Sequence, residues 1–299
     1  MSESHSIGWR PFVALVIGVL AVSTAAIFIR LAQEESAPSL VIAAGRLTVA
    51  SIALTPMVLA RHKQQIRQVQ RDDLAWALTG GLVLGLHFAA WITSLEYTSV
   101  VNSVVLVTTA PLWVALMAPL FLGEKLGLWI VAGLALAFGG GILVSLSGDA
   151  GSPPTRHDPI LGNGLAIFGA VMAAIYFMIG RRLRARLGLV SYIWLVYSTA
   201  AMILIVAVLV SGLSVTGLPA EAYLWMILMG LVPQLVGHSS YNYALGYLPA
   251  AYVSLTVLGE PIGSGLLAMF FLNEQPVLFQ LIGSVFILFG IVVASREQR

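Results

Sequence analysis

Long apolar runs separated by short polar segments follow one another along almost the whole chain. Most runs hold about 20 residues, the length of an α-helix that crosses the hydrocarbon core of a membrane. Backbone groups in lipid must pair within their own segment or in a closed barrel, and continuous runs without alternation indicate helices. The pattern predicts ten membrane spans, at residues 11–31, 38–60, 74–95, 98–121, 127–147, 160–181, 190–212, 222–245, 249–272 and 277–295.

Part of the chain occurs twice. The stretch 95–140 returns after a shift of 150 residues, and the ungapped register pairs Pro111 with Pro261 and Glu124 with Glu274. Apolar sequences match leucines and alanines by chance, but they rarely match proline and glutamate in one register. The chain is therefore predicted to be a duplicated unit.

The duplication divides the chain into two halves of five spans, residues 11–147 and 160–295. A linker at 148–159, rich in Gly, Pro, Ser and Asp, joins them. Because five is odd, the second half is expected to enter the membrane in the opposite orientation to the first. Inverted repeats of this kind are typical of secondary transporters, whose binding sites lie where the repeats meet. The predicted fold class is all-α integral membrane.

Composition agrees with this prediction. The chain is 59% hydrophobic and 9% charged, whereas a soluble domain carries roughly a quarter charged residues. It has no cysteine, which excludes disulfides and thiolate metal sites. The first apolar run is too long for the core of a secretory signal and lacks a small-residue cleavage site, so we expect it to remain as a span.

The basic residues predict the topology. Of the 15 Lys and Arg residues, twelve fall at one side of the predicted spans, Arg156 falls at the other, and Arg30 and Arg46 lie within spans. Because cytoplasmic loops carry the excess of positive charge, residues 1–10 and 296–299 are predicted to be cytoplasmic. The basic clusters are then topology determinants beside anionic lipid, and no nucleic-acid partner is expected.

Several motifs resemble a known family. The chain resembles EamA-type exporters of the drug/metabolite transporter superfamily, and the likeness covers residues 11–295. It is carried by the motifs AAGRLTVASIALTP, FLGEKL and VGHSSYNYALGYLPAAYVSLTVLGEP. The resemblance implies a bacterial inner-membrane carrier without a cofactor, often an exporter of amino acids or related metabolites. A membrane-embedded enzyme is the less favoured alternative, because the acidic residues are scattered.

The eighth span carries a polar face. Gln234, His238, Tyr241 and Asn242 recur at helical spacing, and such groups are costly against lipid, so they are expected to face the interior or a wet cavity. A hydrogen-bonded helix seam is the alternative. Pro233 is expected to kink the helix.

The third span offers a related face. His87 and Trp91 are one turn apart, and the shift of 150 residues pairs Trp91 with Tyr241. Two aromatic residues related by the repeat could contact a planar or apolar substrate group, although packing is the alternative role. Histidine titrates near neutral pH, which leaves a proton-linked step open.

Three further polar residues within spans complete the candidate substrate contacts: Arg46, Asn102 and Glu260. Glu260 could hold an ammonium group or a proton, or it could form a structural contact. Arg46 could bind a carboxylate with two hydrogen bonds or brace a neighbouring helix, and the structural role is the favoured one. No cluster of metal ligands appears, so no metal is expected.

These observations predict an alternating-access carrier of a small amphipathic solute. An amino acid fits best, with Glu260 for its ammonium group, Arg46 for its carboxylate, and Trp91 and Tyr241 for its side chain. Carriers of neutral or cationic solutes, such as nucleosides or drugs, remain the alternative. One chain has enough spans to enclose a path, so a monomer is plausible and a homodimer is possible.

Overall fold

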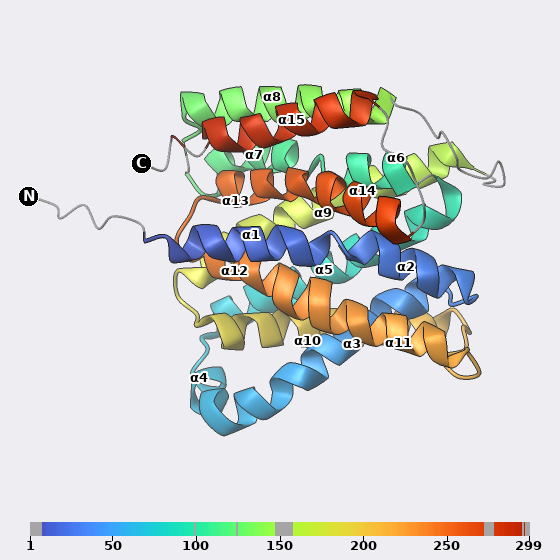
Figure 1. The fold of residues 1–299 in the computed structure, drawn as a ribbon. Helices are drawn as coiled ribbons and strands as arrows, with labels where there is room; N and C mark the ends of the chain where they lie inside the picture. The colour runs from blue at the N-terminus through green and yellow to red at the C-terminus, as the bar shows by residue number, and fades with distance from the viewer. Residues whose placement is uncertain are drawn as a thin grey trace, which may run out of the picture.

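The computed structural model describes residues 8–98, 100–123, 125–146, 158–271, 278–294 and 296 (Figure 1). Its elements in chain order are α1 Arg10–Val22, α2 Ala25–Glu34, α3 Ser39–Met57, the π-helix η1 Val58–His62, α4 Lys63–Arg67, α5 Arg71–Tyr97, α6 Val100–Val107, α7 Ala110–Phe121, α8 Leu128–Leu146, α9 Pro159–Arg184, α10 Leu189–Val210, α11 Ala220–Met229, the π-helix η2 Gly230–His238, α12 Ser239–Ala244, α13 Ala250–Thr256, the 3-10 helix η3 Val257–Gly259, α14 Glu260–Phe271 and α15 Leu278–Ala294.

Among the residues that the structure describes, eight helical segments are long and apolar enough to cross a membrane. They are Arg10–Glu34, Ser39–Arg67, Arg71–Tyr97, Ser103–Phe121, Ile160–Arg184, Leu189–Val210, Ala220–Ala244 and Ala250–Leu267. Two shorter apolar helices, within α8 and α15, occupy the positions of the fifth and tenth predicted spans. The protein is therefore an all-helical integral membrane protein in its described ranges.

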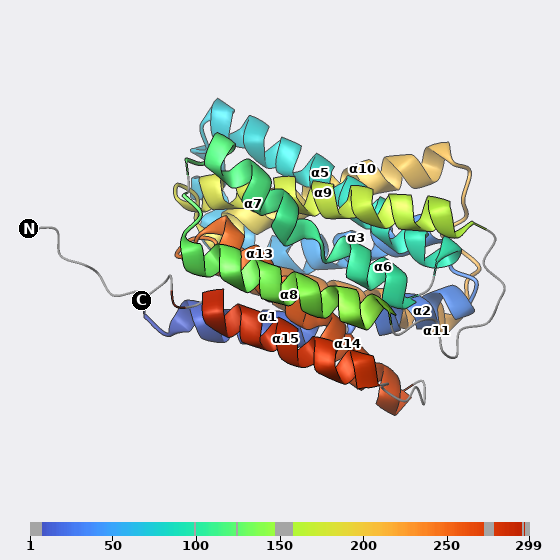
Figure 2. The ribbon, with the colours of Figure 1, turned by 90° about the horizontal axis from the view of Figure 1, so that it is seen from above.

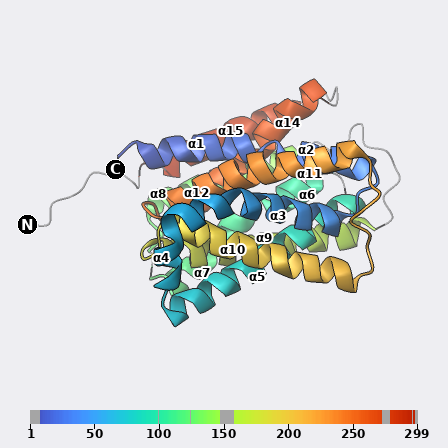
Figure 3. The same cartoon turned by 90° about the horizontal axis from the view of Figure 1, so that it is seen from below.

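The helices pack in neighbouring pairs that join the two halves of the chain. α8 packs along α15, α5 along α9, and α10 against both α3 and α5 (Figures 2 and 3). Glycines permit the closest approach: a side-chain carbon added to Gly133 of α8 would lie 2.5 Å from the carbonyl oxygen of Gly290 in α15. Small residues at such contacts let helices pack tightly where no hydrophobic effect drives association.

Equivalent helices of the two halves run in opposite directions. In Figure 1, α1 begins at the left and α8 ends at the right, whereas α9 begins at the right and α15 ends at the left. The start of α1 and the end of α15 therefore lie at the same end of the bundle.

Several predicted spans are interrupted. The span expected at 98–121 is two helices, α6 and α7, separated at Thr108 and Thr109. The hydroxyl of Thr108 donates to the carbonyl of Val104 at 2.8 Å, a local bond that competes with regular helix geometry. The span at 249–272 likewise contains the 3-10 turn η3.

The two π-helices were not predicted. η1 and α4 extend the second span to Arg67, so residues 61–67, which were predicted as a loop, are helical. Around Pro233, η2 forms nine residues of π-helix. Proline cannot donate to a carbonyl in the preceding turn, and both prolines and π segments are places where helices bend.

Some expectations fall outside the described residues. These are most of the linker, Glu124, Glu274, the first seven residues and residues 297–299. The side chain of Asn102 is also outside them, although its backbone belongs to α6.

Candidate functional site

A small cavity lies where helices of the two halves meet. Its volume is about 40 Å³, enough for one or two water molecules. The lining residues are Val22, Ala25, Arg46, His87, Trp91, Val107, Thr108, Ala110, Ala173, Phe177, His238, Tyr241, Val257 and Glu260. Six of the nine predicted substrate contacts are thus brought together: Arg46, His87, Trp91, His238, Tyr241 and Glu260.

Arg46 brings a buried guanidinium to the cavity from the middle of α3. The residue is 0% exposed. Its Nε donates to Oε1 of Gln234 at 2.8 Å, and its guanidinium carbon lies 4.0 Å from the ring centroid of Phe88. Both terminal nitrogens are buried and have no hydrogen-bond partner among the described residues.

His87 and Trp91 form one wall. They lie one turn apart on α5, with ring centroids 6.0 Å apart and planes at 17°. Nδ1 of His87 lies 2.9 Å from the carbonyl oxygen of Gly169 on α9, so Nδ1 carries the proton in this contact. The bond fixes the orientation of the His87 ring. The indole N–H of Trp91 is also buried, and it has no hydrogen-bond partner in the described ranges.

His238 and Tyr241 form the facing wall. His238 ends η2 and Tyr241 belongs to α12. The His238 ring centroid lies 5.2 Å from that of Phe88 and 6.5 Å from that of His87. Nδ1 of His238 and the hydroxyl of Tyr241 are buried without partners in the part of the chain that the structure describes. These rings therefore supply both apolar surface and polar atoms.

Glu260 supplies the carboxylate. It is 6% exposed and begins α14, directly after the turn η3. Its backbone carbonyl accepts a hydrogen bond from the hydroxyl of Ser264 at 2.9 Å.

Within the described ranges, three of the five unpaired buried polar atoms at the cavity, those of Arg46 and Trp91, can only donate hydrogen bonds. The buried polar atoms at its lining that lack partners among the described residues are Nη1 and Nη2 of Arg46, Nε1 of Trp91, Nδ1 of His238 and the hydroxyl of Tyr241. Buried donors without acceptors are costly, so this lining suits a solute that brings acceptor oxygens.

A second group of polar residues, here called the tyrosine layer, lies beside the cavity. It consists of Tyr176, Tyr197 and Asn242, each at most 1% exposed. Nδ2 of Asn242 lies 2.5 Å from the hydroxyl of Tyr176, 3.4 Å from that of Tyr197 and 2.8 Å from the carbonyl oxygen of His238. Arg184 contacts the same layer, because its Nε donates to the carbonyl oxygen of Asn242 at 2.9 Å.

The other predicted contacts are placed differently. Gln234 touches Arg46 but does not line the cavity, and Asn242 belongs to the tyrosine layer. The predicted face assumed regular α-helix, whereas η2 changes the register between Gln234 and His238. The side chain of Asn102 lies outside the described residues.

Sequence reasoning missed Phe88 and Phe177, which pack around the histidines and Tyr241. Phe88 carried a usable signal, because the shift of 150 residues pairs it with His238. Phe177 carried none, since a phenylalanine in an apolar span is ordinary.

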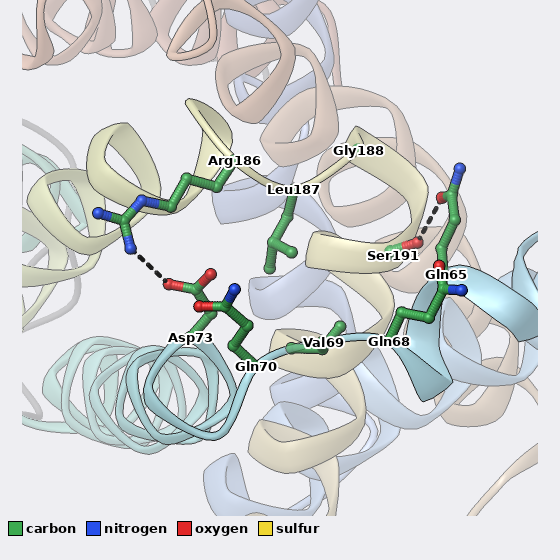
Figure 4. Close-up of a pocket in the computed structure, with 9 residues that line it drawn as sticks. All are labelled: Gln65, Gln68, Val69, Gln70, Asp73, Arg186, Leu187, Gly188 and Ser191. Carbon is green, nitrogen blue, oxygen red and sulfur yellow. Dashed lines mark hydrogen bonds and ion pairs between the residues drawn. The ribbon is translucent and has the colours of Figure 1, made fainter.

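A larger pocket, of about 670 Å³, lies elsewhere, between α4, α5 and the start of α10 (Figure 4). Asp73 and Arg186 form an ion pair across it at 3.2 Å, and the hydroxyl of Ser191 donates to Gln65 at 3.1 Å. Four of its polar side chains thus pair with one another, and it shares no lining residue with the cavity. Neither site suits a metal: within the described ranges, no three His, Asp or Glu residues group closely enough.

Comparisons with known proteins agree with this architecture. A family model described as the EamA-like transporter family matches residues 9–146 and 160–296. A relative from Streptantibioticus cattleyicolor, named a probable terminal-alkyne amino-acid exporter, is 25% identical over 255 residues, 84% of this chain and 82% of its own. An uncharacterized transporter from Archaeoglobus fulgidus is 25% identical over 285 residues, 95% of this chain and 96% of its own.

A protein of known crystal structure shares the fold. It has a TM-score of 0.73 at 20% identity, and the match covers 97% of both chains. With one family match in each half, the chain belongs to the EamA-like transporter family and is a multi-pass membrane transporter, not an enzyme.

Proposed function

We propose that this transporter moves a small amphipathic metabolite, an amino acid or a related compound, out of the cell by alternating access around the cavity. The observation that carries the proposal is the origin of the lining. Arg46, His87 and Trp91 come from the first half, and His238, Tyr241 and Glu260 come from the second. A solute bound there contacts both halves, as alternating access by inverted repeats requires.

The proposed topology has ten spans in two inverted halves, with both termini cytoplasmic in the inner membrane. The opposite directions of α1 and α9, and of α8 and α15, support it (Figure 1). The excess of Lys and Arg at one side supports the orientation. A monomer is the proposed working unit, because one chain has enough spans to enclose a path, and a homodimer is the alternative.

An amino acid matches the two charged groups. Glu260 is suited to an ammonium group and Arg46 to a carboxylate, while Trp91 and Tyr241 offer surface for a side chain. The name of the Streptantibioticus cattleyicolor relative supports the same class of solute. The cavity of about 40 Å³ is smaller than any amino acid, so the halves must separate at one side to admit one.

Proteoliposomes loaded with the twenty amino acids test the proposal. Liposomes that contain the purified protein should release at least one amino acid faster than loaded liposomes without protein. Glu260→Gln should lower that rate of release about tenfold, since the ammonium group of the amino acid loses its charged partner. Glu34→Gln is the matched control, because its side chain is 58% exposed in a pair with Arg30. If no amino acid is released, amino-acid transport is refuted.

A second candidate is transport of neutral or cationic solutes, such as nucleosides or drugs. The aromatic walls and the carboxylate of Glu260 favour it. Release of nucleosides or organic cations from the same liposomes, without release of amino acids, would identify this class.

A further inference from the structure

The contacts of Arg46 leave one part of its guanidinium available. Its Nε donates a hydrogen bond to Gln234, and the ring of Phe88 lies against one face of the planar guanidinium. Arg46 lines the cavity, and its Nη1 and Nη2 have no hydrogen-bond partner in the described ranges. Because a guanidinium is planar and rigid, these two nitrogens can meet both oxygens of one carboxylate, end on.

The position of Gln234 is set by close helix packing. A side-chain carbon added to Gly230 would lie 2.6 Å from Cβ of Val49 and 2.9 Å from the carbonyl oxygen of Arg46, so only glycine lets η2 approach α3 this closely. Gln234 follows within the same π-helix and reaches Nε at 2.8 Å. The amide thus fixes the rotation of the guanidinium.

A brace between helices would use the same side chain differently. A bracing arginine donates its terminal nitrogens to carbonyls or carboxylates of a neighbouring helix, as Arg181 does to the carbonyl of Leu245 at 2.9 Å. Arg46 makes no such bond within the described chain, and it forms no ion pair with Glu260 there, although both line the cavity.

We propose that Gln234 is a positioning residue that holds the Arg46 guanidinium end on, so that the transported solute must carry a carboxylate. The inference rests on the proposed function, since it names the substrate class of the same cavity. Gln234 thereby contributes to substrate recognition although it does not line the cavity. The carboxylate of the solute is required for binding, and its ammonium group is less important.

Two variants of Gln234 separate positioning from packing. Gln234→Leu removes the acceptor at similar volume and should raise KM for an exported amino acid about tenfold, with the maximal rate within twofold. Gln234→Glu places a carboxylate beside the guanidinium, which should compete with the solute and raise KM further. Gln65→Leu is the control, since it breaks the bond with Ser191 at the distant pocket.

Binding to the purified protein gives a second measurement that needs no transport. L-valine, L-leucine and L-phenylalanine are compared with their carboxamides, and 3-phenylpropanoate tests a carboxylate without an ammonium group. At least one amino acid and 3-phenylpropanoate should raise the thermal unfolding midpoint, and the carboxamides should not. Both Gln234 variants should reduce the rise, whereas Gln65→Leu should leave it unchanged.

The outcomes distinguish the two proposals. The inference is overturned if a carboxamide stabilises as well as its amino acid, if no carboxylate stabilises, or if both Gln234 variants keep the wild-type KM. Release of amino acids by such a protein would leave the proposed function standing. Conversely, carboxylate binding that depends on Gln234, without release of any amino acid, would refute the function and support the site.

Discussion

The cavity and the tyrosine layer are neighbours made of similar side chains. Both bury polar groups between helices, and the rings of His238 and Tyr176 lie 6.3 Å apart across their boundary. In the tyrosine layer, the Asn242 amide nitrogen meets two hydroxyls and a carbonyl. At the cavity, buried donors lack partners among the described residues. Oδ1 of Asn242 also lacks a partner among the described residues, so the tyrosine layer is the better paired of the two regions and not a fully paired one. Paired groups rigidify a core, whereas several unpaired donors can bond to a solute.

The comparison predicts that cavity variants lose transport and keep stability, while variants of the tyrosine layer do the reverse. Arg46→Met should give the largest effect, a fall in transport of about 100-fold, because two charge-assisted bonds to the solute are lost. Its unfolding midpoint should stay equal or rise, since a buried charge without an ionic partner in the described chain is removed.

Arg46→Lys is the matched variant for this prediction. It keeps the charge but loses the planar fork, so transport should remain well below the wild type. Unfolding or aggregation of both variants would make Arg46 a brace and erase the distinction between the two regions.

Asn242→Leu should give the opposite result. It leaves the hydroxyls of Tyr176 and Tyr197 without their shared partner, at a cost of about 1–3 kcal/mol in the free energy of unfolding. KM should not change, because Asn242 does not line the cavity. Thermal unfolding and transport kinetics of the same preparation measure both quantities.

A double-mutant cycle sharpens that result. Tyr176→Phe combined with Asn242→Leu should destabilise less than the sum of the single variants, since both remove the same hydrogen bond. Additive effects would show that the tyrosine layer is not one network.

The two cavity histidines differ in the same respect, because within the described ranges one is paired with the protein and the other is not. His87 Nδ1 bonds to Gly169, whereas Nδ1 of His238 has no partner among the described residues. His87→Phe should therefore lower stability by about 1 kcal/mol, and His238→Phe should instead raise KM severalfold. Equal effects on stability would remove the proposed solute contact of His238.

Arg186→Gln should give the smallest effect. The arginine side chain of the Asp73 pair is 58% exposed, so the pair contributes less than about 1 kcal/mol and is screened by salt. Transport and the unfolding midpoint should match the wild type. A clear loss of transport would show that the larger pocket takes part in function.

Much of this arrangement could be predicted from the sequence. The repeat register paired Trp91 with Tyr241, and both line the cavity. The cost of charge in lipid singled out Arg46 and Glu260, which line it as well. Such predictions need only the order of residues along the chain, either in two repeated segments or within one span.

The rest depends on contacts between distant segments. The bond from Arg46 to Gln234 joins residues 188 positions apart, and the partners of Asn242 lie on two other helices. η2 was not predicted either; it contains Pro233 and packs against α1 and α3, which are distant in the sequence. Periodicity therefore named Gln234 correctly as interior while missing what it touches.

The cationic and anionic ends of the cavity belong to different halves of the chain: Arg46 sits on α3 and Glu260 on α14. A zwitterion that binds both residues would hold the two halves together. When the halves separate, each half would keep only one of the two charged contacts, which is too few to retain the solute. Binding and release of the solute would then be coupled directly to the movement of the two halves. A molecule with a single charged group would bind to one half without linking it to the other.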